Sequence, residues 1–227
     1  MNYPVCRQSR SLVGDLFQSR SLAGDLFQSH RRQCVCLPLP CRWVGPNSST
    51  RYRIRRTSVL LKEVEIFSDG ACRGNPGLGG YGVVLKFGAH RRELSRGFVR
   101  TTNNRMELLG AIAGLEELKH SCRVTLCSDS RYLVNAMTRG WLKKWKAFGW
   151  RRGPGQRLRN EDLWKRLDAA CEGHEVNWQW VKGHAGHAEN ERCDVLAVQA
   201  TEQSELPTDE GYLDEEQLAG EEPGLFD

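Results

Sequence analysis

The sequence predicts an α/β domain in which helices flank a mixed sheet of five strands, three antiparallel strands followed by parallel ones. Three segments that alternate apolar and polar residues are joined by short Gly-containing turns, which is typical of antiparallel hairpins. The spacing of apolar residues then becomes helical near residue 103, and strands and helices alternate from there to about residue 200. Hairpins followed by strand–helix alternation indicate a mixed sheet covered by helices.

The predicted elements follow from these patterns in order. Strands are expected over residues 63–67, 81–87, 93–99, 123–127 and 176–180. Helices are expected over residues 103–119, 130–137, 160–171 and 188–200. In the longest helix Leu108, Ile112 and Leu115 fall on one side, and Thr102 or Asn103 can cap its start.

Charge is segregated along the 227 residues, although the formal net charge is only +5. Residues 1–60 carry ten Lys or Arg and two Asp or Glu, whereas residues 61–200 carry 23 and 16. Residues 201–227 carry ten acidic groups and no Lys or Arg. The basic body indicates a polyanionic partner. The acidic tail over 201–227, which contains Pro and Gly, is predicted to be disordered.

Residues 1–61 are predicted to be a basic extension that is disordered or has no part in the fold. QSRSLVGDLF at 8–17 is repeated almost unchanged as QSRSLAGDLF at 18–27, and two copies are too few to stack as a solenoid. An Arg- and Ser-rich segment with few acids also suits an organelle transit peptide. Alternatively, translation begins near Val59 or Leu60, and the upstream residues reflect a wrong gene start.

The cysteines and the apolar runs predict a cytoplasmic protein that does not enter a membrane. Five of the nine cysteines lie within 61–200 and form no CxxC pair, which favours reduced thiols over a disulfide framework. No uninterrupted apolar run reaches the 18 or so residues that a membrane-spanning helix needs. We expect a monomer.

Three acids stand where predicted elements begin or end. Asp69 follows the first strand in FSDGACRGNPG, Glu107 lies early in the long helix in TTNNRMELLGA, and Asp129 follows the fourth strand in LCSDSRY. Such positions can converge at one edge of a sheet. Converging carboxylates repel one another and acquire raised pKa values unless cations are present, and hard oxygen ligands suit Mg²⁺ or Mn²⁺.

Asp194 and His184 extend this set. Asp194 lies on the last helix, ten residues after His184. Four acids can hold two divalent ions, which at roughly 3.5–4 Å apart activate a water and stabilise a leaving oxygen. His184 stands on a Gly-bounded loop and can shuttle protons near neutral pH. Each residue also has a simpler interpretation: a turn for an Asp before Gly, the helix dipole for Glu107, or zinc binding by His184, His187 and Cys193.

At these residues the chain resembles bacterial type 1 ribonuclease H over about residues 62–200. The resemblance is carried, in order, by SDGACRGNPGLGGYG, TTNNRMEL, SDSRYLVNA, GWLKKWKAFGW, NEDLWKRLDAA and WVKGHAGHAENERCD. It implies a five-stranded sheet flanked by helices. It also implies an endonuclease that hydrolyses the RNA strand of RNA–DNA hybrids by a two-metal-ion mechanism and leaves 5′-phosphate and 3′-hydroxyl ends.

The resemblance also assigns roles to residues. Catalysis and metal binding fall to Asp69, Glu107, Asp129 and Asp194, with Mg²⁺ (or Mn²⁺) as cofactor and two ions when substrate is bound. His184 becomes a mobile general acid–base group. The residues expected to contact the hybrid are Cys72, Arg73, Gly74, Asn75, Asn103, Asn104, Trp141, Lys143, Lys144, Trp145 and Lys146.

The segment WLKKWKAFGWRR at 141–152 matches the basic protrusion that holds the DNA strand in this family. Its five basic residues can neutralise phosphates, whereas its three tryptophans are more simply explained as core packing. The opposite charge of the tail suggests that residues 201–227 fold over the protrusion and compete with nucleic acid. Other hypotheses are a Holliday-junction resolvase or DNA exonuclease of the same fold, a hybrid-binding module without catalysis, and a domain tethered to a larger machine.

Overall fold

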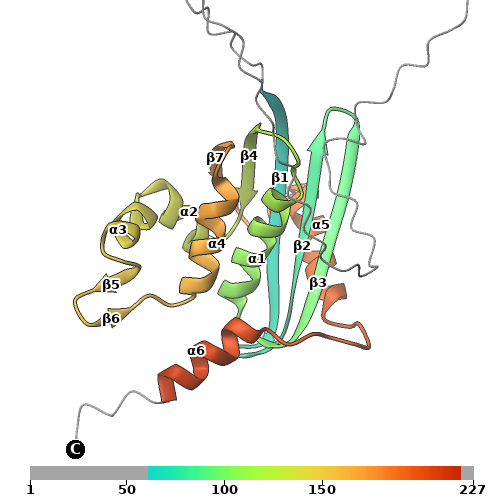
Figure 1. The fold of residues 1–227 in the computed structure, drawn as a ribbon. Coiled ribbons are helices and arrows are strands. Elements are labelled where there is room, and N and C mark those ends of the chain that lie inside the picture. The colour runs from blue at the N-terminus through green and yellow to red at the C-terminus, as the bar shows by residue number, and fades with distance from the viewer. Residues whose placement is uncertain (1–60, 221–227) are drawn as a thin grey trace, which may run out of the picture. The chain divides into compact units, whose positions relative to one another are not determined.

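The computed structural model describes residues 61–220, and these contain a five-stranded mixed sheet in the order β3-β2-β1-β4-β7 (Figure 1). Its strands are β1 (Lys62–Gly74), β2 (Gly77–Phe87), β3 (His90–Thr101), β4 (Cys122–Ser128) and β7 (Glu175–Trp180). The first three pair antiparallel, whereas β4 runs parallel to both β1 and β7. The predicted fold class is therefore confirmed. The predictions for residues 1–60 lie outside the described residues.

Six helices accompany the sheet within the described residues. They are α1 (Asn103–Glu116), α2 (Arg131–Thr138), α3 (Trp141–Ala147), α4 (Glu161–Cys171), α5 (Ala188–Ala200) and α6 (Glu210–Gly220). The four helices expected from apolar spacing correspond to α1, α2, α4 and α5. Thr102 takes the N-cap position of α1, but its side chain makes no capping hydrogen bond.

The sheet separates two apolar layers because successive strand residues face opposite sides. Leu85 packs into the large core with Leu108 of α1 and Trp164 of α4. Its neighbour Val84 faces the other way, toward Cys193 of α5. Figure 1 shows α1 and α4 in front of the sheet and α5 behind it. Burial of each large apolar side chain contributes about 1.5–3 kcal/mol, and this holds the helices against the sheet.

Two features were not predicted from the sequence. One is a short hairpin of β5 (Arg151–Gly153) and β6 (Gln156–Arg157), which follows α3 and completes the protrusion. The other is the order of the acidic segment: the prediction of disorder over 201–227 is wrong for residues 201–220. Pro207 accepts a backbone hydrogen bond from Val99 at 3.0 Å, and Asp209 is only 5% exposed before α6 begins.

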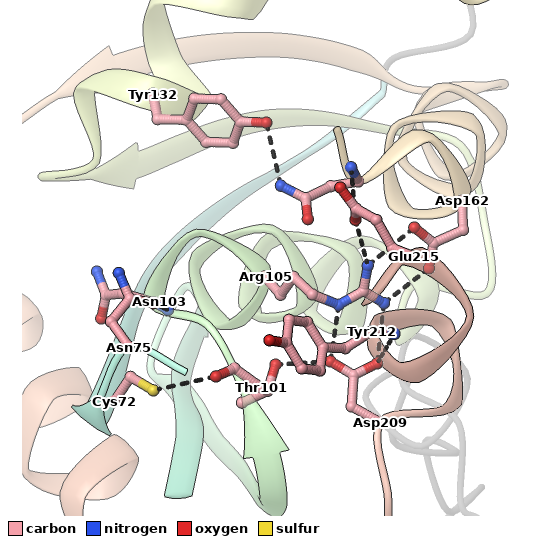
Figure 2. Close-up of polar contacts among 11 residues, drawn as sticks. Cys72, Asn75, Thr101, Asn103, Arg105, Tyr132, Asp162, Asp209, Tyr212 and Glu215 are labelled. Atoms are coloured by element: carbon pink, nitrogen blue, oxygen red, sulfur yellow. Dashed lines mark hydrogen bonds and ion pairs between the residues drawn. The ribbon is translucent and has the colours of Figure 1, made fainter. Parts of the chain in front are cut away.

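A buried arginine explains why this acidic segment is ordered. Arg105 of α1 is 1% exposed, and its guanidinium donates to Asp209 at 2.7 and 2.8 Å and to Asp162 at 2.9 and 2.7 Å (Figure 2). Glu215 lies 3.8 Å from the same group, and Thr101 donates to Asp209 at 2.6 Å. Although burial opposes the charged form, the hydrogen bonds to Asp162 and Asp209 raise the pKa of Arg105. A buried cation requires such partners, so the Arg105 cluster (these five residues) joins α1, α4 and α6.

All five cysteines in the described part of the chain are free thiols: Cys72, Cys122, Cys127, Cys171 and Cys193. In the same part, no helix combines the length and the apolar character needed to cross a bilayer.

Candidate active site

Asp69 and Asp129 lie where β1 and β4 separate. The two strands pair in parallel as far as Phe67 and Cys127. Asp69 lies within β1, not at its end as the sequence suggested, because β1 continues to Gly74 in its pairing with β2. It is 8% exposed, whereas Asp129 directly follows β4 and is half-buried. The two acids therefore share the carboxyl edge of adjacent parallel strands, where sites of α/β folds form.

Glu107 reaches this edge because α1 packs directly on β1. A Cβ added to Gly70 would lie 2.5 Å from the Glu107 backbone nitrogen, so only glycine allows this approach. The Asn103 amide donates to Glu107 Oε1 at 2.9 Å, and the Ser130 hydroxyl donates to Oε2. Both oxygens of Glu107 are thus oriented by neighbours of the site.

Asp194 enters from the opposite face of the sheet, on α5. The preceding residue, Cys193, is fully buried and donates its thiol to the Phe67 carbonyl at 3.3 Å. This contact brings the second turn of α5 against β1, two residues before Asp69. Asp194 is close enough for its charge to raise the pKa of Asp69.

His184 lies on the loop between β7 and α5 that passes over Asp129. A Cβ added to the preceding residue, Gly183, would lie 2.4 Å from Asp129 Oδ2. His184 itself is exposed and has a left-handed backbone with φ 52°. The structure therefore brings His184 next to a residue that touches the carboxylates and leaves its imidazole in solvent, as a mobile proton carrier requires.

Burial and repulsion by neighbouring carboxylates raise the pKa values of two of the four acids, Asp69 and Glu107. Burial, followed by repulsion from Asp129, raises the pKa of Asp69 to about 8, with smaller contributions from Asp194 and Glu107. Burial also raises the pKa of Glu107 to about 7, against the stabilising hydrogen bond from Ser130. Within residues 61–220 none of these carboxylates forms an ion pair, and an external cation would relieve the repulsion.

The four carboxylates are suitable ligands for a hard divalent cation, but within residues 61–220 they are not yet arranged as a metal site. Nowhere in that range do three His, Cys, Asp or Glu groups converge closely enough to form a ready metal centre. The four acids offer oxygen atoms, which Mg²⁺ and Mn²⁺ prefer, and the hydrogen bonds from Asn103 and Ser130 hold the Glu107 carboxylate in place. The zinc alternative is wrong, because the Cys193 thiol faces the interior while His184 and His187 are exposed.

The predicted hybrid contacts form two groups beside the acids. In the first group the Asn103 backbone N–H donates to the Asn75 side chain at 3.3 Å, and the Cys72 thiol donates to the Thr101 carbonyl at 3.5 Å (Figure 2). The turn after β1 and the start of α1 are therefore held together. Arg73 forms an exposed ion pair with Glu202 at 2.5 Å, and its contact with the hybrid stays a prediction.

The second group surrounds a groove of about 470 Å³ that we call the protrusion groove. Its lining residues are Asn104, Tyr132, Trp141, Trp145, Arg152, Leu158, Arg159 and Asn160. Trp145 also packs on Trp164 with ring centroids 5.2 Å apart, which confirms the packing role expected for the tryptophans. Three predicted contact residues, Asn104, Trp141 and Trp145, thus share one groove.

The basic residues of α3 differ in their availability. Lys143 and Lys144 are exposed, and within residues 61–220 neither forms an ion pair. Lys146 is paired with Asp168 at 2.5 Å, so its charge is partly compensated. Lys143 and Lys144 are therefore the better candidates for phosphate contacts.

Three residues beside the four acids were not predicted from the sequence: Ser130, Arg131 and Trp180. Ser130 orients Glu107, and the Trp180 indole donates to the Asp129 carbonyl at 2.9 Å. The Arg131 guanidinium lies 4.9 Å from the centre of the Trp180 ring. Ser130 and Arg131 directly follow Asp129 in the sequence, so their position alone could have marked them as candidates. Trp180 could be recognised only once β7 was paired with β4.

A mixed sheet that brings four carboxylates toward one edge, beside a groove lined by arginines, is the arrangement of a hydrolase that acts on a polyanion. The family model for RNase H matches residues 61–202. The ribonuclease H of Rippkaea orientalis is 60% identical over 151 residues, covering 66% of this chain and 93% of the relative. That of Proteus mirabilis is 55% identical over 158 residues, covering 70% and 98%. The chain belongs to the ribonuclease H family.

A solved structure supports the same assignment at the level of the fold and sequence together. LC9-RNase H1, described as a type 1 RNase H with the type 2 active-site motif, superimposes with a TM-score of 0.59 at 36% identity. The match covers 64% of this chain and 75% of that one.

Proposed function

We propose that this chain cuts the RNA strand of RNA–DNA hybrids at internal positions and leaves 5′-phosphate and 3′-hydroxyl ends. The observation that carries the proposal is the approach of Asp69, Glu107, Asp129 and Asp194 to one edge of the sheet. Membership of the ribonuclease H family supports the substrate and the reaction.

The four carboxylates would hold Mg²⁺, with Mn²⁺ as the alternative and two ions when substrate is bound. Such ions would lower the pKa of a bound water and stabilise the leaving oxygen. Asn103 and Ser130 orient the Glu107 carboxylate, and the contact of Gly183 with Asp129 keeps the His184 loop beside the acids. His184 is suited to deliver a proton to the leaving 3′-oxygen, because its imidazole is exposed on the loop beside the acids.

Two surfaces would hold the two strands. On the RNA side, the segment Cys72–Asn75 with Asn103 and Asn104 presents amides and backbone groups that can recognise 2′-hydroxyls, which both donate and accept hydrogen bonds. On the DNA side, Lys143 and Lys144 would bind phosphates beside the protrusion groove. Contacts of both kinds recognise sugar and backbone, so we expect little base preference.

The decisive experiment uses a hybrid with each strand labelled in turn, with and without Mg²⁺, for the wild type and Asp129→Asn. We expect internal cuts in the RNA strand alone, dependent on metal and lost in the variant. Cutting of duplex DNA or of four-way junctions would instead favour the exonuclease or resolvase hypothesis. Tight hybrid binding with no cutting by the wild type would favour a binding module.

The DNA-side surface has a separate test. Lys144→Gln should raise the Michaelis constant and reduce the slope of its logarithm against the logarithm of salt concentration by about 1, with an unchanged kcat. Lys62→Gln, at the first residue of β1, is the matched control and should leave the slope unchanged. An equal slope in all three proteins would remove Lys144 from the binding surface.

We also propose a monomer that works in the cytoplasm. The five free thiols of the described residues support a reducing compartment. Light scattering of the purified chain and fractionation of cells that express it would test the two statements.

A further inference from the structure

Helix α6 carries only negative charge and lies after the last residue that the family model matches. Its acidic residues are Glu210, Asp214, Glu215 and Glu216, and residues 210–220 include no Lys or Arg. The match to the RNase H family model ends at residue 202, before α6 begins. None of these four acids is among the residues to which the proposed reaction gives a role.

Contacts with basic and polar groups hold α6 against the domain. Glu216 accepts from the Arg100 guanidinium at 2.7 and 3.3 Å. Glu215 accepts from the Asn160 backbone N–H at 3.0 Å and lies 3.8 Å from Arg105. A Cβ added to Gly211 would lie 2.2 Å from Asp162 Oδ2, so the first turn of α6 sits directly on the Arg105 cluster.

A cavity of about 680 Å³ separates the side of α6 from the β5–β6 hairpin. Arg152, Arg157 and Arg159 line it from the hairpin and the segment that follows. Asp214 and Glu215 line it from α6. Within residues 61–220 no ion pair joins these acids to these three arginines, so the opposed charges face each other across solvent.

Two of these arginines are shared with the protrusion groove. Arg152 and Arg159, with Leu158 between them in the fold, line both cavities. Asn160, whose backbone N–H is bound by Glu215, also lines the protrusion groove and donates to the Tyr132 hydroxyl at 3.2 Å. The acidic helix and the groove assigned to the DNA strand therefore face opposite sides of the same basic segment.

We propose that α6 is a built-in competitor of the hybrid: its carboxylates compete with DNA-strand phosphates for Arg152 and Arg159 and so weaken hybrid binding. The inference rests on the proposed function, because it takes the protrusion groove as the DNA-strand site. An arginine already near a carboxylate gains less from a phosphate, and the carboxylates of α6 also repel the approaching strand. Salt screens both effects, because exposed charges interact weakly beyond about 8 Å at physiological ionic strength.

The contact between Asp209 and Arg105 determines which variants can test this competition. Deletion of residues 201–227 would remove Asp209 and uncover the buried Arg105, so a loss of folding would hide any change in binding. Asp214→Asn with Glu216→Gln removes two exposed charges and leaves Asp209, Glu215 and the Arg105 cluster intact.

Hybrid affinity of this double variant should be measured by fluorescence anisotropy with Mg²⁺, in an Asp129→Asn background that binds without cutting. We expect the dissociation constant to fall about threefold to tenfold at 50 mM salt and to converge with that of the parent near 300 mM. In the active protein the Michaelis constant should fall in parallel at unchanged kcat.

The matched control is Glu63→Gln with Glu175→Gln, which removes two exposed acids that pair with Arg123 at the start of β4. An equal gain in the control would mean that net charge alone matters and would overturn the proposal. Unchanged or weaker binding by the α6 variant would also overturn it. A wild type that binds the hybrid but never cuts it would refute the proposed function, and the anisotropy result would still decide the role of α6.

Discussion

Two clusters of carboxylates meet α1 at positions two residues apart, one at Arg105 and the other at Glu107. The clusters differ in the source of the positive charge that balances them. Asp162, Asp209 and Glu215 surround the buried guanidinium of Arg105, which the chain supplies itself. The four candidate active-site acids include Glu107, two residues further along α1, and within residues 61–220 none of them forms an ion pair. The pKa values of Asp69 and Glu107 are raised by burial and repulsion.

This difference shows how one residue type serves stability in one place and chemistry in another. Carboxylates around a buried cation are tightly ordered, and they cannot be removed without leaving that cation unpaired. Carboxylates that only repel one another lower the stability of the metal-free protein. The same repulsion favours the binding of divalent cations, because a bound cation relieves it. The four predictions below test this contrast, in order of decreasing expected effect.

Glu107→Gln should lower the rate of RNA cleavage by at least about 10³-fold, because an amide is a poor ligand for a divalent cation and removes one of the four charges. Single-turnover cleavage of a labelled hybrid would measure it. Glu116→Gln, at the other end of α1, is the matched control and should retain activity within about twofold. A Glu107→Gln variant of near-normal activity would exclude Glu107 from the site.

Asp209→Asn should lower the free energy of unfolding by about 3–5 kcal/mol, because Arg105 would keep a buried charge that lacks its least exposed partner. Urea denaturation followed by circular dichroism would measure the loss. We expect the rate of cleavage per folded molecule to change far less than in Glu107→Gln. A loss below about 1 kcal/mol would mean that the Arg105 cluster does not anchor α6.

Asp69→Asn should stabilise the metal-free protein at pH 8 by about 1–3 kcal/mol while it abolishes cleavage. The pKa of Asp69 rises from an ordinary 3.8 to about 8, mainly through burial and then through repulsion by Asp129. The folded state therefore binds a proton that the unfolded state has released, so wild-type stability falls as the pH rises from about 4 to about 8. The asparagine variant should escape this fall.

Urea denaturation in EDTA at pH 4 and pH 8 would measure the effect of Asp69→Asn. The gain should be absent at pH 4 and should shrink at pH 8 when Mg²⁺ is added, because a bound cation stabilises the wild type selectively. Equal stability of the two proteins at pH 8 without metal would contradict the repulsion among the four acids.

Asp162→Asn should lower the free energy of unfolding by only about 1–2 kcal/mol, the smallest of the four effects. Its side chain is 45% exposed, so water can replace part of its interaction with Arg105. The same urea experiment compares it with Asp209→Asn. A loss as large as that of Asp209→Asn would show that burial of the partner carboxylate does not set the strength of the pair.

The sequence by itself determined the order of the five strands of the sheet and of α1, α2, α4 and α5, and it singled out the four acids and His184 as candidates. Alternation and helical spacing are local, and the long motifs around Asp69, Glu107, Asp129 and Asp194 mark the family wherever they occur.

Only the tertiary structure decided the fate of the acidic segment. Composition predicted a solvated tail over 201–227, because ten acids without a base cannot build an apolar core. The acidic segment is instead held by Arg105, which lies about a hundred residues earlier in the chain. The buried guanidinium of Arg105 donates two hydrogen bonds to Asp209, just before α6. Local patterns cannot reveal such a demand, because the cost of a buried charge arises only when distant segments pack around it.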